Sequence, residues 1–358
     1  MSVEDNNMRR SKEFLIILLF LQSIICAGRE FYITPDGETV YYSPQPRVFV
    51  YKPKAEEKRQ DLFILNGNEP RSVTEPTGLF IDRNDRIYIS DAGRNAVNVF
   101  SPRGDFLKTM IHETGDSRTL HRPGPLAMNP FGDLFIIDTE TRDVLCYDFS
   151  GRLISPLETP ANKGRQIDSP SAIAITPAGD LFVADAKKCR ILHFSFKREL
   201  IGAWGEAGSA NGQLGRPGGI ASGVTGELYV TDTENHRVQV FQPDGTLAYF
   251  AEVATKAEKW LFGQKGSRWG DLSLPSSIAV NHSGILAVVD SSGGRIQLFT
   301  PLGKFLGGVV FDRDKEGLPE VRADAIAFDS IGSLYILDGR GRRILKVFPH
   351  EQNAWLKP

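Results

Sequence analysis

Cysteine and net charge are both scarce in this sequence. The chain has 3 Cys in 358 residues and a formal net charge of −2 at pH 7. So few cysteines exclude the dense disulfide framework of small secreted domains. A near-neutral chain also gives no electrostatic reason to expect nucleic acid as a partner. A phosphate-binding glycine loop, a G-x-S-x-G motif and a C-x-x-C pair are absent as well. No motif therefore points to a nucleotide-binding protein, a serine hydrolase or a dithiol redox enzyme.

No apolar run reaches the length of a membrane-spanning helix. The longest, "FLIILLFLQSIIC" from Phe14 to Cys26, is shorter than the roughly 20 residues that a span requires. It follows the basic stretch Arg9 to Lys12, and small residues come after it. Residues 1–28 therefore predict an export signal, and with it a periplasmic or extracellular protein. The alternative is an uncleaved anchor formed by residues 13–27, which would be the chain's one contact with a membrane.

Six segments of the chain repeat one pattern. The fourth, "RPGGIASGVTGELYVTDTENHRVQVFQPDG" from Arg216 to Gly245, aligns without gaps with segments that begin at Glu75, Arg122, Ser169, Leu274 and Arg322. One aspartate stands at the same place in each: Asp91, Asp138, Asp185, Asp232, Asp290 and Asp338, at spacings of 47, 47, 47, 58 and 48 residues. A recurring period of this size indicates a repeat architecture in which each unit stacks on the next.

Each repeat contains the pattern of three short strands, and the first five repeats add a fourth. In the fourth repeat "GIAS", "ELYVTD" and "HRVQVF" read as the first three, and "LAYFAEV" reads as a looser fourth. Gly226 and its counterparts fall where a tight hairpin needs a residue that tolerates a positive φ. Four antiparallel strands in a unit of about 45 residues predict a propeller blade. The fold class is therefore all-β: a six-bladed β-propeller of four-stranded antiparallel blades.

The two ends of the repeat region predict how the ring closes. The last repeat lacks a fourth strand, whereas an unassigned strand, "DLFILNG" from Asp61 to Gly67, precedes the first repeat. An N-terminal strand that completes the last blade would remove an exposed sheet edge. The predicted organisation is a signal or anchor (1–28), an extension with the ring-closing strand (29–74), six repeats (75–350) and a tail (351–358). Cys146 and Cys189 occupy different repeat positions, so we expect both to be free thiols.

The fourth repeat resembles the NHL repeat along its whole length, and the resemblance covers about Glu75 to His350. It implies a six-bladed propeller but no single activity, because function depends on the site rather than on the fold. In similar amidating lyases, histidines at the starts of the inner strands hold zinc; the corresponding starts here contain no His. Gluconolactonase-like propellers use calcium, and Asp324 is the one acid in these starts. A metal-dependent lyase or lactonase is therefore the alternative function, and no metal or cofactor is assigned.

The aspartate of each repeat has a structural interpretation. A residue used in every blade serves what every blade shares. At the turn between the second and third strands its carboxylate can accept backbone N–H bonds. Four of the six are followed five residues later by Arg190, Arg237, Arg295 and Arg343, which predicts ion pairs. No second His shares the repeat position of His236, the conspicuous residue of "TENHR", and a zinc site needs three or four converging ligands.

The variable residues predict where a partner binds. The turns between second and third strands and the links between blades lie on one face of the ring, which we call the link face. From repeat to repeat these loops differ more than the strands do, and binding residues are usually found on such loops. The predicted binding residues, including two tryptophans that are candidate anchors, are Arg94, Arg142, Lys187, His236, Trp260, Trp269, Arg340 and Arg342. The repeat spacing grows by eleven residues within Ala251 to Asp271, and this stretch contains both Trp260 and Trp269. The two side chains are either interface anchors or local packing. We therefore expect a monomeric binding or scaffolding protein for a protein or glycan.

Overall fold

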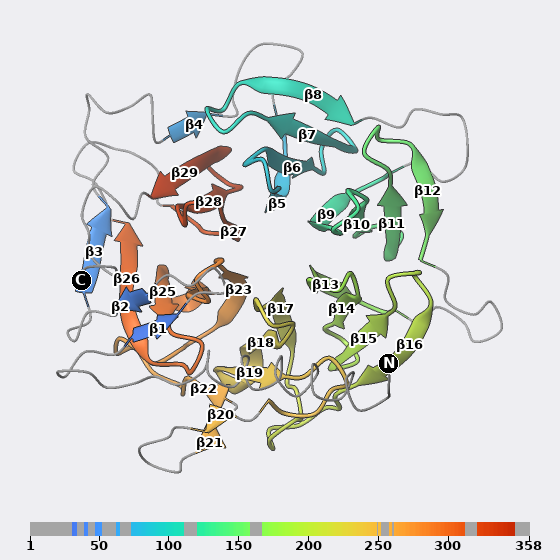
Figure 1. Cartoon of the computed structure of the whole chain (residues 1–358). Helices are drawn as coiled ribbons and strands as arrows, with labels where there is room; N and C mark the ends of the chain where they lie inside the picture. The colour runs from blue at the N-terminus through green and yellow to red at the C-terminus, as the bar shows by residue number, and fades with distance from the viewer. Residues whose placement is uncertain are drawn as a thin grey trace, which may run out of the picture.

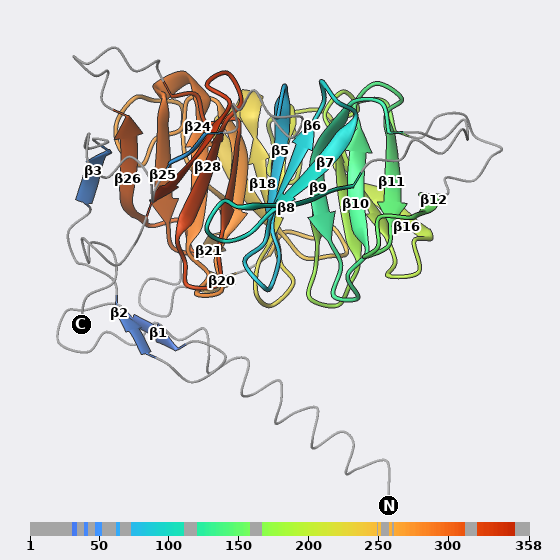
Figure 2. The ribbon, with the colours of Figure 1, turned by 90° about the horizontal axis from the view of Figure 1, so that it is seen from above.

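The computed structural model describes residues 31–33, 39–41, 47–51, 62–64, 73–110, 120–157, 167–248, 250–251, 258–259, 261–311 and 321–347. Six antiparallel sheets stand around a central axis like the blades of a propeller (Figure 1), and the ring is a flat disc from the side (Figure 2). The predicted fold class is confirmed. The signal or anchor, the C-terminal tail and Trp260 lie outside the described residues.

The blades follow one another in sequence order, with the first strand innermost. Blade one is β5 (Pro76–Ile81), β6 (Ile87–Asp91), β7 (Ala96–Phe100) and β8 (Phe106–Met110); blade two is β9 (Pro123–Met128), β10 (Leu134–Asp138), β11 (Asp143–Tyr147) and β12 (Leu153–Pro156); blade three is β13 (Pro170–Ile175), β14 (Leu181–Asp185), β15 (Arg190–Phe194) and β16 (Leu200–Trp204).

Blades four to six depart from this simple order. Blade four is β17 (Pro217–Ser222), β18 (Leu228–Asp232), β19 (Arg237–Phe241) and β22 (Leu261–Phe262); blade five is β23 (Pro275–Val280), β24 (Leu286–Asp290), β25 (Arg295–Phe299), β26 (Phe305–Phe311) and β3 (Arg47–Tyr51); blade six is β27 (Ala325–Phe328), β28 (Leu334–Asp338), β29 (Arg343–Val347) and β4 (Leu62–Ile64). The remaining elements are hairpins β1 (Phe31–Ile33) with β2 (Thr39–Tyr41) and β20 (Phe250–Ala251) with β21 (Glu258–Lys259), and the short helices η1 (Thr233–Asn235) and η2 (Ser291–Gly293).

The N-terminal segment contributes two strands to the ring. The strand β4 pairs antiparallel with β29 and completes blade six, as the sequence predicts. The strand β3 pairs in parallel with β26 and adds a fifth strand to blade five, which the sequence does not predict. Blades six and one also meet through Ser330, whose backbone N–H donates to the Asp85 carboxylate at 2.8 Å.

One strand of blade four was assigned wrongly from the sequence. The stretch "LAYFAEV" is not the fourth strand: Leu247 forms only an isolated bridge with Phe241. The fourth strand is β22, whose Phe262 is the partner of Val238. The reason is that the extra residues interrupt the strand itself, so the chain leaves the sheet after Ala248 and rejoins it at Leu261.

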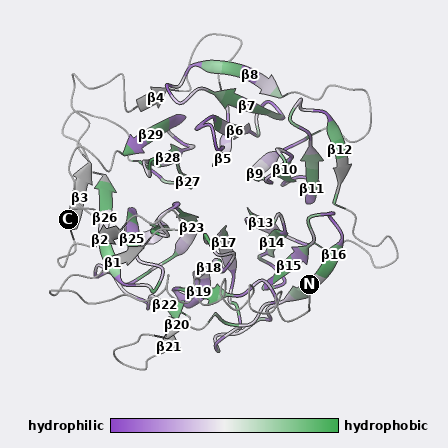
Figure 3. Cartoon of the chain, in the orientation of Figure 1, coloured by the Kyte–Doolittle hydropathy of each residue, from purple (hydrophilic) through white to green (hydrophobic). Residues whose placement is uncertain are grey.

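Apolar side chains fill the spaces between blades. The second strands are buried throughout, and six apolar clusters each join two neighbouring blades, including blade six with blade one. Figure 3 shows the hydrophobic colouring along the strands, with hydrophilic residues at many of the turns. Face-to-face packing of blades therefore uses both surfaces of each sheet. It leaves two faces of the disc for function: the link face and the opposite one.

We call the opposite face the hairpin face. It carries the turns between first and second strands (82–86, 129–133, 176–180, 223–227, 281–285 and 329–333) and those between third and fourth strands (101–105, 148–152, 195–199, 242–246 and 300–304). Because strands in a blade alternate in direction, all of these turns emerge on the side away from the links.

Candidate functional site

The six aspartates are the anchors of the link face. All six side chains are fully buried. Asp91 accepts backbone N–H bonds from Gly93 in its own turn and from Thr74 and Glu75 in the link before the blade, at 3.2, 2.9 and 2.9 Å. The predicted bonds to the turn are confirmed in this blade. The bonds to residues 16 and 17 positions earlier were missed, although their constant offset recurs in blades one, two, three and five.

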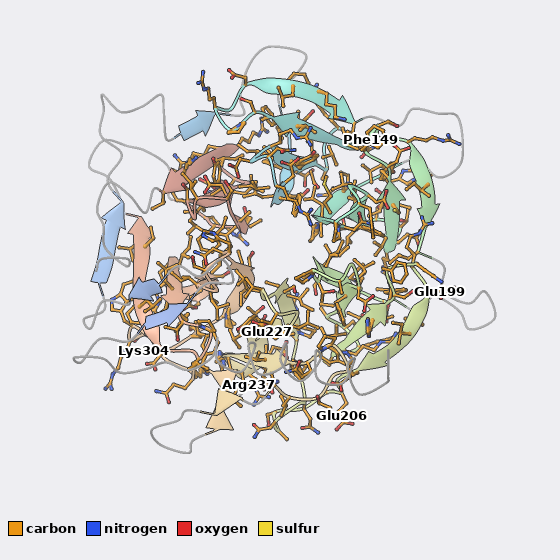
Figure 4. All side chains as sticks on the ribbon, in the orientation of Figure 1. Phe149, Glu199, Glu206, Glu227, Arg237 and Lys304 are labelled. Carbon is orange, nitrogen blue, oxygen red and sulfur yellow. The ribbon has the colours of Figure 1, made fainter. Side chains whose placement is uncertain are left out.

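The four predicted ion pairs are all present. Arg237, Arg295 and Arg343 lie 2.9, 3.0 and 2.8 Å from Asp232, Asp290 and Asp338, whereas Arg190 lies 3.6 Å from Asp185. The first three guanidinium groups are nearly buried and Arg190 is a quarter exposed. Figure 4 shows Arg237 within blade four. These carboxylates are thus engaged in holding the blade, which supports their structural interpretation.

His236 belongs to a ring of turn residues with left-handed backbone. Its φ is 60°, and the same position in the other blades has a positive φ too: Asn95, Arg142, Cys189, Gly294 and Arg342. The Nδ1 atom of His236 is hydrogen-bonded to the backbone carbonyl of Ser273, in the link to blade five. Cys189 Sγ contacts the carbonyl of Gly215 in the same way. His236 therefore bridges two blades in a half-buried position.

Two of the predicted basic residues share one acid. Arg142 and Lys187 lie 3.2 and 3.0 Å from the Asp168 carboxylate, in the link between blades two and three. The hydrogen bond from Lys187, with the nearby positive charges of Lys188 and Arg142, lowers the pKa of Asp168 below its ordinary value. Asp168 offsets one of these positive charges, so this part of the link face is less positive than its basic residues alone suggest.

The other predicted arginines lie on the two blades that close the ring. Arg340 and Arg342 are exposed in the turn of blade six, and Arg94 is exposed in the turn of blade one. Within the described chain, Arg340 and Arg342 have no carboxylate within ion-pair distance. Blades six and one are neighbours. The structure therefore brings these three predicted residues to one sector of the link face and separates them from Arg142 and Lys187.

Trp269 packs against its own blade. Its ring stacks on Phe305 at 5.6 Å, and the Arg295 guanidinium lies 5.1 Å from the ring centroid. Gly308 makes this approach possible, because a Cβ atom there would come within 2.3 Å of the indole. The side chain remains about a third exposed. Of the two interpretations, local packing thus accounts for most of its contacts.

The hairpin face holds features that the sequence analysis missed. A cavity of about 510 Å³ opens at this end of the central axis, above Phe80, Met128, Ile175 and Val280. Its rim is made by turns of five blades and includes Phe131, which is 71% exposed. Two further phenylalanines, Phe149 and Phe196, are exposed in neighbouring turns. The sequence contains a signal for these two residues. Other repeats have a proline at the same turn position, namely Pro102, Pro243 and Pro301, and Phe149 and Phe196 stand in its place.

Either a metal centre or a reactive thiol could support catalysis in the described part of the chain. No set of three or more His, Cys, Asp or Glu side chains is arranged there to hold a metal ion. Burial raises the pKa of Cys146 to about 11, so this thiol is protonated at neutral pH and a poor nucleophile. Cys146 and Cys189 are both free thiols, as expected. Among the helices described here, none has the length and apolar character to cross a bilayer.

Comparisons with known proteins agree with this fold. Residues 214–241, in the fourth repeat, match the NHL repeat model. No curated protein matches the sequence. A streptogramin B lyase structure superposes with a TM-score of 0.55 at 13% identity over 80% of this chain and 96% of that one. A virginiamycin B lyase from Staphylococcus aureus gives 0.51 at 14% over 89% and 87%, and a putative gluconolactonase gives 0.55 at 14% over 80% and 92%. At these identities the likeness shows the fold alone.

Proposed function

We propose that this six-bladed propeller with an NHL repeat is an exported binding protein whose link face recognises an acidic protein or an anionic glycan. The observation that carries the proposal is the group of three exposed arginines, Arg94, Arg340 and Arg342, on adjacent blades. Arginine suits such a role, because its planar guanidinium pairs with carboxylate and sulfate-like groups through two parallel hydrogen bonds.

The arrangement of the link face supports recognition without chemistry. Buried aspartates fix the turns from below, so the arginines project from rigid hairpins. Long-range attraction between such bases and an acidic partner would speed association and weaken as salt rises. A protein that holds a partner in this way needs no nucleophile and no metal.

The test is a set of charge reversals measured against an anionic polysaccharide column and against partners captured from the exported fraction. Arg340→Glu and Arg342→Glu should weaken salt-sensitive binding by about tenfold each, as expected for charged contacts worth about 1.4 kcal/mol. Arg142→Glu and Lys187→Glu should have smaller effects, because both side chains already pair with Asp168. Arg152→Glu and Lys304→Glu on the hairpin face serve as controls. Weakened binding from the controls alone would contradict the proposal.

The lyase or lactonase alternative makes a separate prediction. A metal-dependent enzyme on this fold would carry close to one zinc or calcium ion per chain after purification, with ligands that include residues outside the described ranges. Metal analysis of the purified protein therefore distinguishes the two functions: stoichiometric metal together with turnover would replace the binding proposal.

A further inference from the structure

Exposed apolar side chains gather in one sector of the disc. Among the described residues ten large apolar side chains are exposed, and six of them belong to blades one to three: Leu107, Phe131, Phe149, Ile154, Phe196 and Ile201. The three phenylalanines lie in turns of the hairpin face, and the others begin the outer strands beside those turns. Figure 3 shows the outer strands β8, β12 and β16 in hydrophobic colours. Contiguous apolar patches of this kind mark interaction sites on soluble proteins.

The three phenylalanines form one continuous group. A Cβ atom on Gly179 would lie 3.3 Å from Cβ of Phe196 and 3.7 Å from Cε2 of Phe131. A Cβ atom on Gly132 would lie 4.0 Å from Cβ of Phe149. Phe196 and Phe131 thus flank the Gly179 turn, and Phe149 lies beside the Gly132 turn, so the three side chains follow one another across blades two and three. Phe149, the most exposed at 79%, is labelled over blade two in Figure 4.

The cavity of the hairpin face lies next to this group. Phe131 belongs to both, since its turn forms part of the rim above Met128 and Ile175. The cavity volume of about 510 Å³ is within the ~300–1,000 Å³ range of pockets that enclose organic ligands, so it can receive an aromatic ring. Protruding rings and a recess that fits a ring are therefore side by side on one face.

The charges around the phenylalanines balance. The turns of blades two and three, together with Lys108 of β8, carry four bases and four acids: Lys108, Arg152, Lys197, Arg198, Asp133, Asp148, Asp180 and Glu199. Some of them steady the patch, as when Lys108 Nζ donates to the carbonyl of Phe149 at 3.1 Å. An anionic bilayer would meet as many acids as bases here. A surface of mixed sign complements another surface of mixed sign.

We infer that the hairpin face binds a second copy of this chain in a two-fold dimer. In such an interface the same surface meets itself, so each protrusion needs a matching recess on that surface. Phe149 or Phe196 of one copy would enter the cavity of the other, and the balanced charges of blades two and three would alternate across the axis. The link faces would then point outward in opposite directions. This differs from the monomer that the sequence suggests and does not depend on the ligand of the link face.

The test is the molar mass of the full chain, measured by sedimentation and light scattering from about 1 to 100 µM, concentrations that span typical specific dimers. The wild type should approach twice the chain mass of 39.6 kDa. Phe149→Asp and Phe196→Asp should each raise the dissociation constant about 30-fold or more, the effect of losing an aromatic anchor of ~2 kcal/mol. Ile331→Asp is the matched control, because Ile331 is 54% exposed on the same face but in blade six.

A substitution in the cavity of the hairpin face tests the dimer without changing the phenylalanines. Ser222→Trp, at the cavity floor, should weaken the dimer as the phenylalanine variants do, while circular dichroism and melting show that each variant folds. A wild-type chain that is monomeric at 100 µM overturns the inference. So does a dimer that persists in Phe149→Asp and Ser222→Trp. A monomer that co-floats with lipid vesicles through Phe149 overturns it too and assigns the patch to a bilayer instead.

Discussion

Blades four and five hold their aspartates differently from blades one and two. In blade four, Asp232 contacts Arg237 and Gln239, at 2.9 and 3.2 Å, and both side chains are buried. In blade one, Asp91 has no arginine five residues later and instead accepts bonds from backbone amides and the Thr74 hydroxyl. Buried arginine and glutamine side chains therefore add to the backbone amides that hold the aspartate in blades four and five, whereas in blade one backbone amides and a hydroxyl hold it without a buried positive charge.

The difference is accompanied by a shared contact in the links that precede blades four and five. Links 205–216 and 263–274 fold alike: Gly212 N–H donates to Gln239 at 2.9 Å, and Gly270 N–H donates to Gln297 at 2.8 Å. Arg237 also donates to two carbonyls of the first link. In blades four and five an Asp–Arg–Gln set thus connects the turn to the preceding link through side chains, whereas in blade one, among the described residues, the Asp91 carboxylate alone makes this connection.

Deletion of the ring-closing segment should have the largest effect on the stability of the ring. Removal of residues 29–68 takes away β3 and β4, exposes the edges of β26 and β29, and leaves blade six with three strands. We expect the melting temperature to fall by at least 10 °C, with aggregation through the open edges. Calorimetry and light scattering measure both. An unchanged melting temperature would contradict closure by the N-terminal segment.

Removal of the carboxylate in blade four should be the next most damaging change. Asp232→Ala leaves Arg237 buried without its partner, and breaking a buried pair in this way costs about 3–5 kcal/mol. Asp91→Ala strands only amides and a hydroxyl, at about 1–3 kcal/mol. Denaturant unfolding of the two variants measures the difference. Equal losses would show that the arginine adds nothing to the anchor.

Asp185 provides an intermediate case and corrects a simple expectation. Repeat position alone suggests that Asp185→Ala and Asp232→Ala cost the same. Arg190, however, is 3.6 Å from Asp185 and a quarter exposed, so water can solvate it when the acid is lost. We expect a loss about 1–2 kcal/mol smaller than that of Asp232→Ala. The double variants Asp185→Ala/Arg190→Met and Asp232→Ala/Arg237→Met separate the pair energies.

The two glutamines test the equivalence of links 205–216 and 263–274. Gln239→Leu and Gln297→Leu each remove the acceptor of a partly buried glycine N–H and one of the two donors to a link carbonyl, at a cost of about 1–3 kcal/mol. The two costs should agree within about 0.5 kcal/mol if the links are energetically alike. The corresponding residue of blade one, Asn98, contacts only Thr109 by its side chain among the bonds described, so Asn98→Leu should cost less.

The smallest effect is expected at Asp324 in blade six. Burial raises the pKa of this carboxyl above its ordinary value, despite a hydrogen bond from Gly339 N–H. An acid with a raised pKa in the folded state favours folding below its ordinary pKa, and that contribution is lost as pH rises from the ordinary value through the raised one. Asp324→Asn should therefore raise the melting temperature slightly at pH 7 and less at pH 4. A lower melting temperature at pH 7 would show that the charge itself stabilises the turn.

The repeat period was enough to predict the blades, the aspartate anchors and the ion pairs, because each rests on a residue that recurs at a constant offset. Features that break the period were harder. The fourth strand of blade four was misplaced because the extra residues fall inside it, and β3 was missed because a parallel edge strand has no partner pattern in the repeats. The exposure of Phe149 and Phe196 depends on how far neighbouring turns reach, and no single repeat contains that information.

The left-handed turn residues have a consequence for how the ring opens. In blades two to four, residues 142, 189 and 236 reach from one blade to the link of the next. Between blades five and six that position is Gly294, which has no side chain to reach with. Within the described part of the chain, the amides of Val321 and Arg322 do not donate to Asp338 either. In a repeat protein each blade is stabilised by its contacts with the two neighbouring blades, so the junction with the fewest contacts is the weakest. We expect this junction to be the first to part, so that amide hydrogens in β27 exchange with solvent before those of any other inner strand, and the protein unwinds from a single gap instead of melting evenly around its circumference.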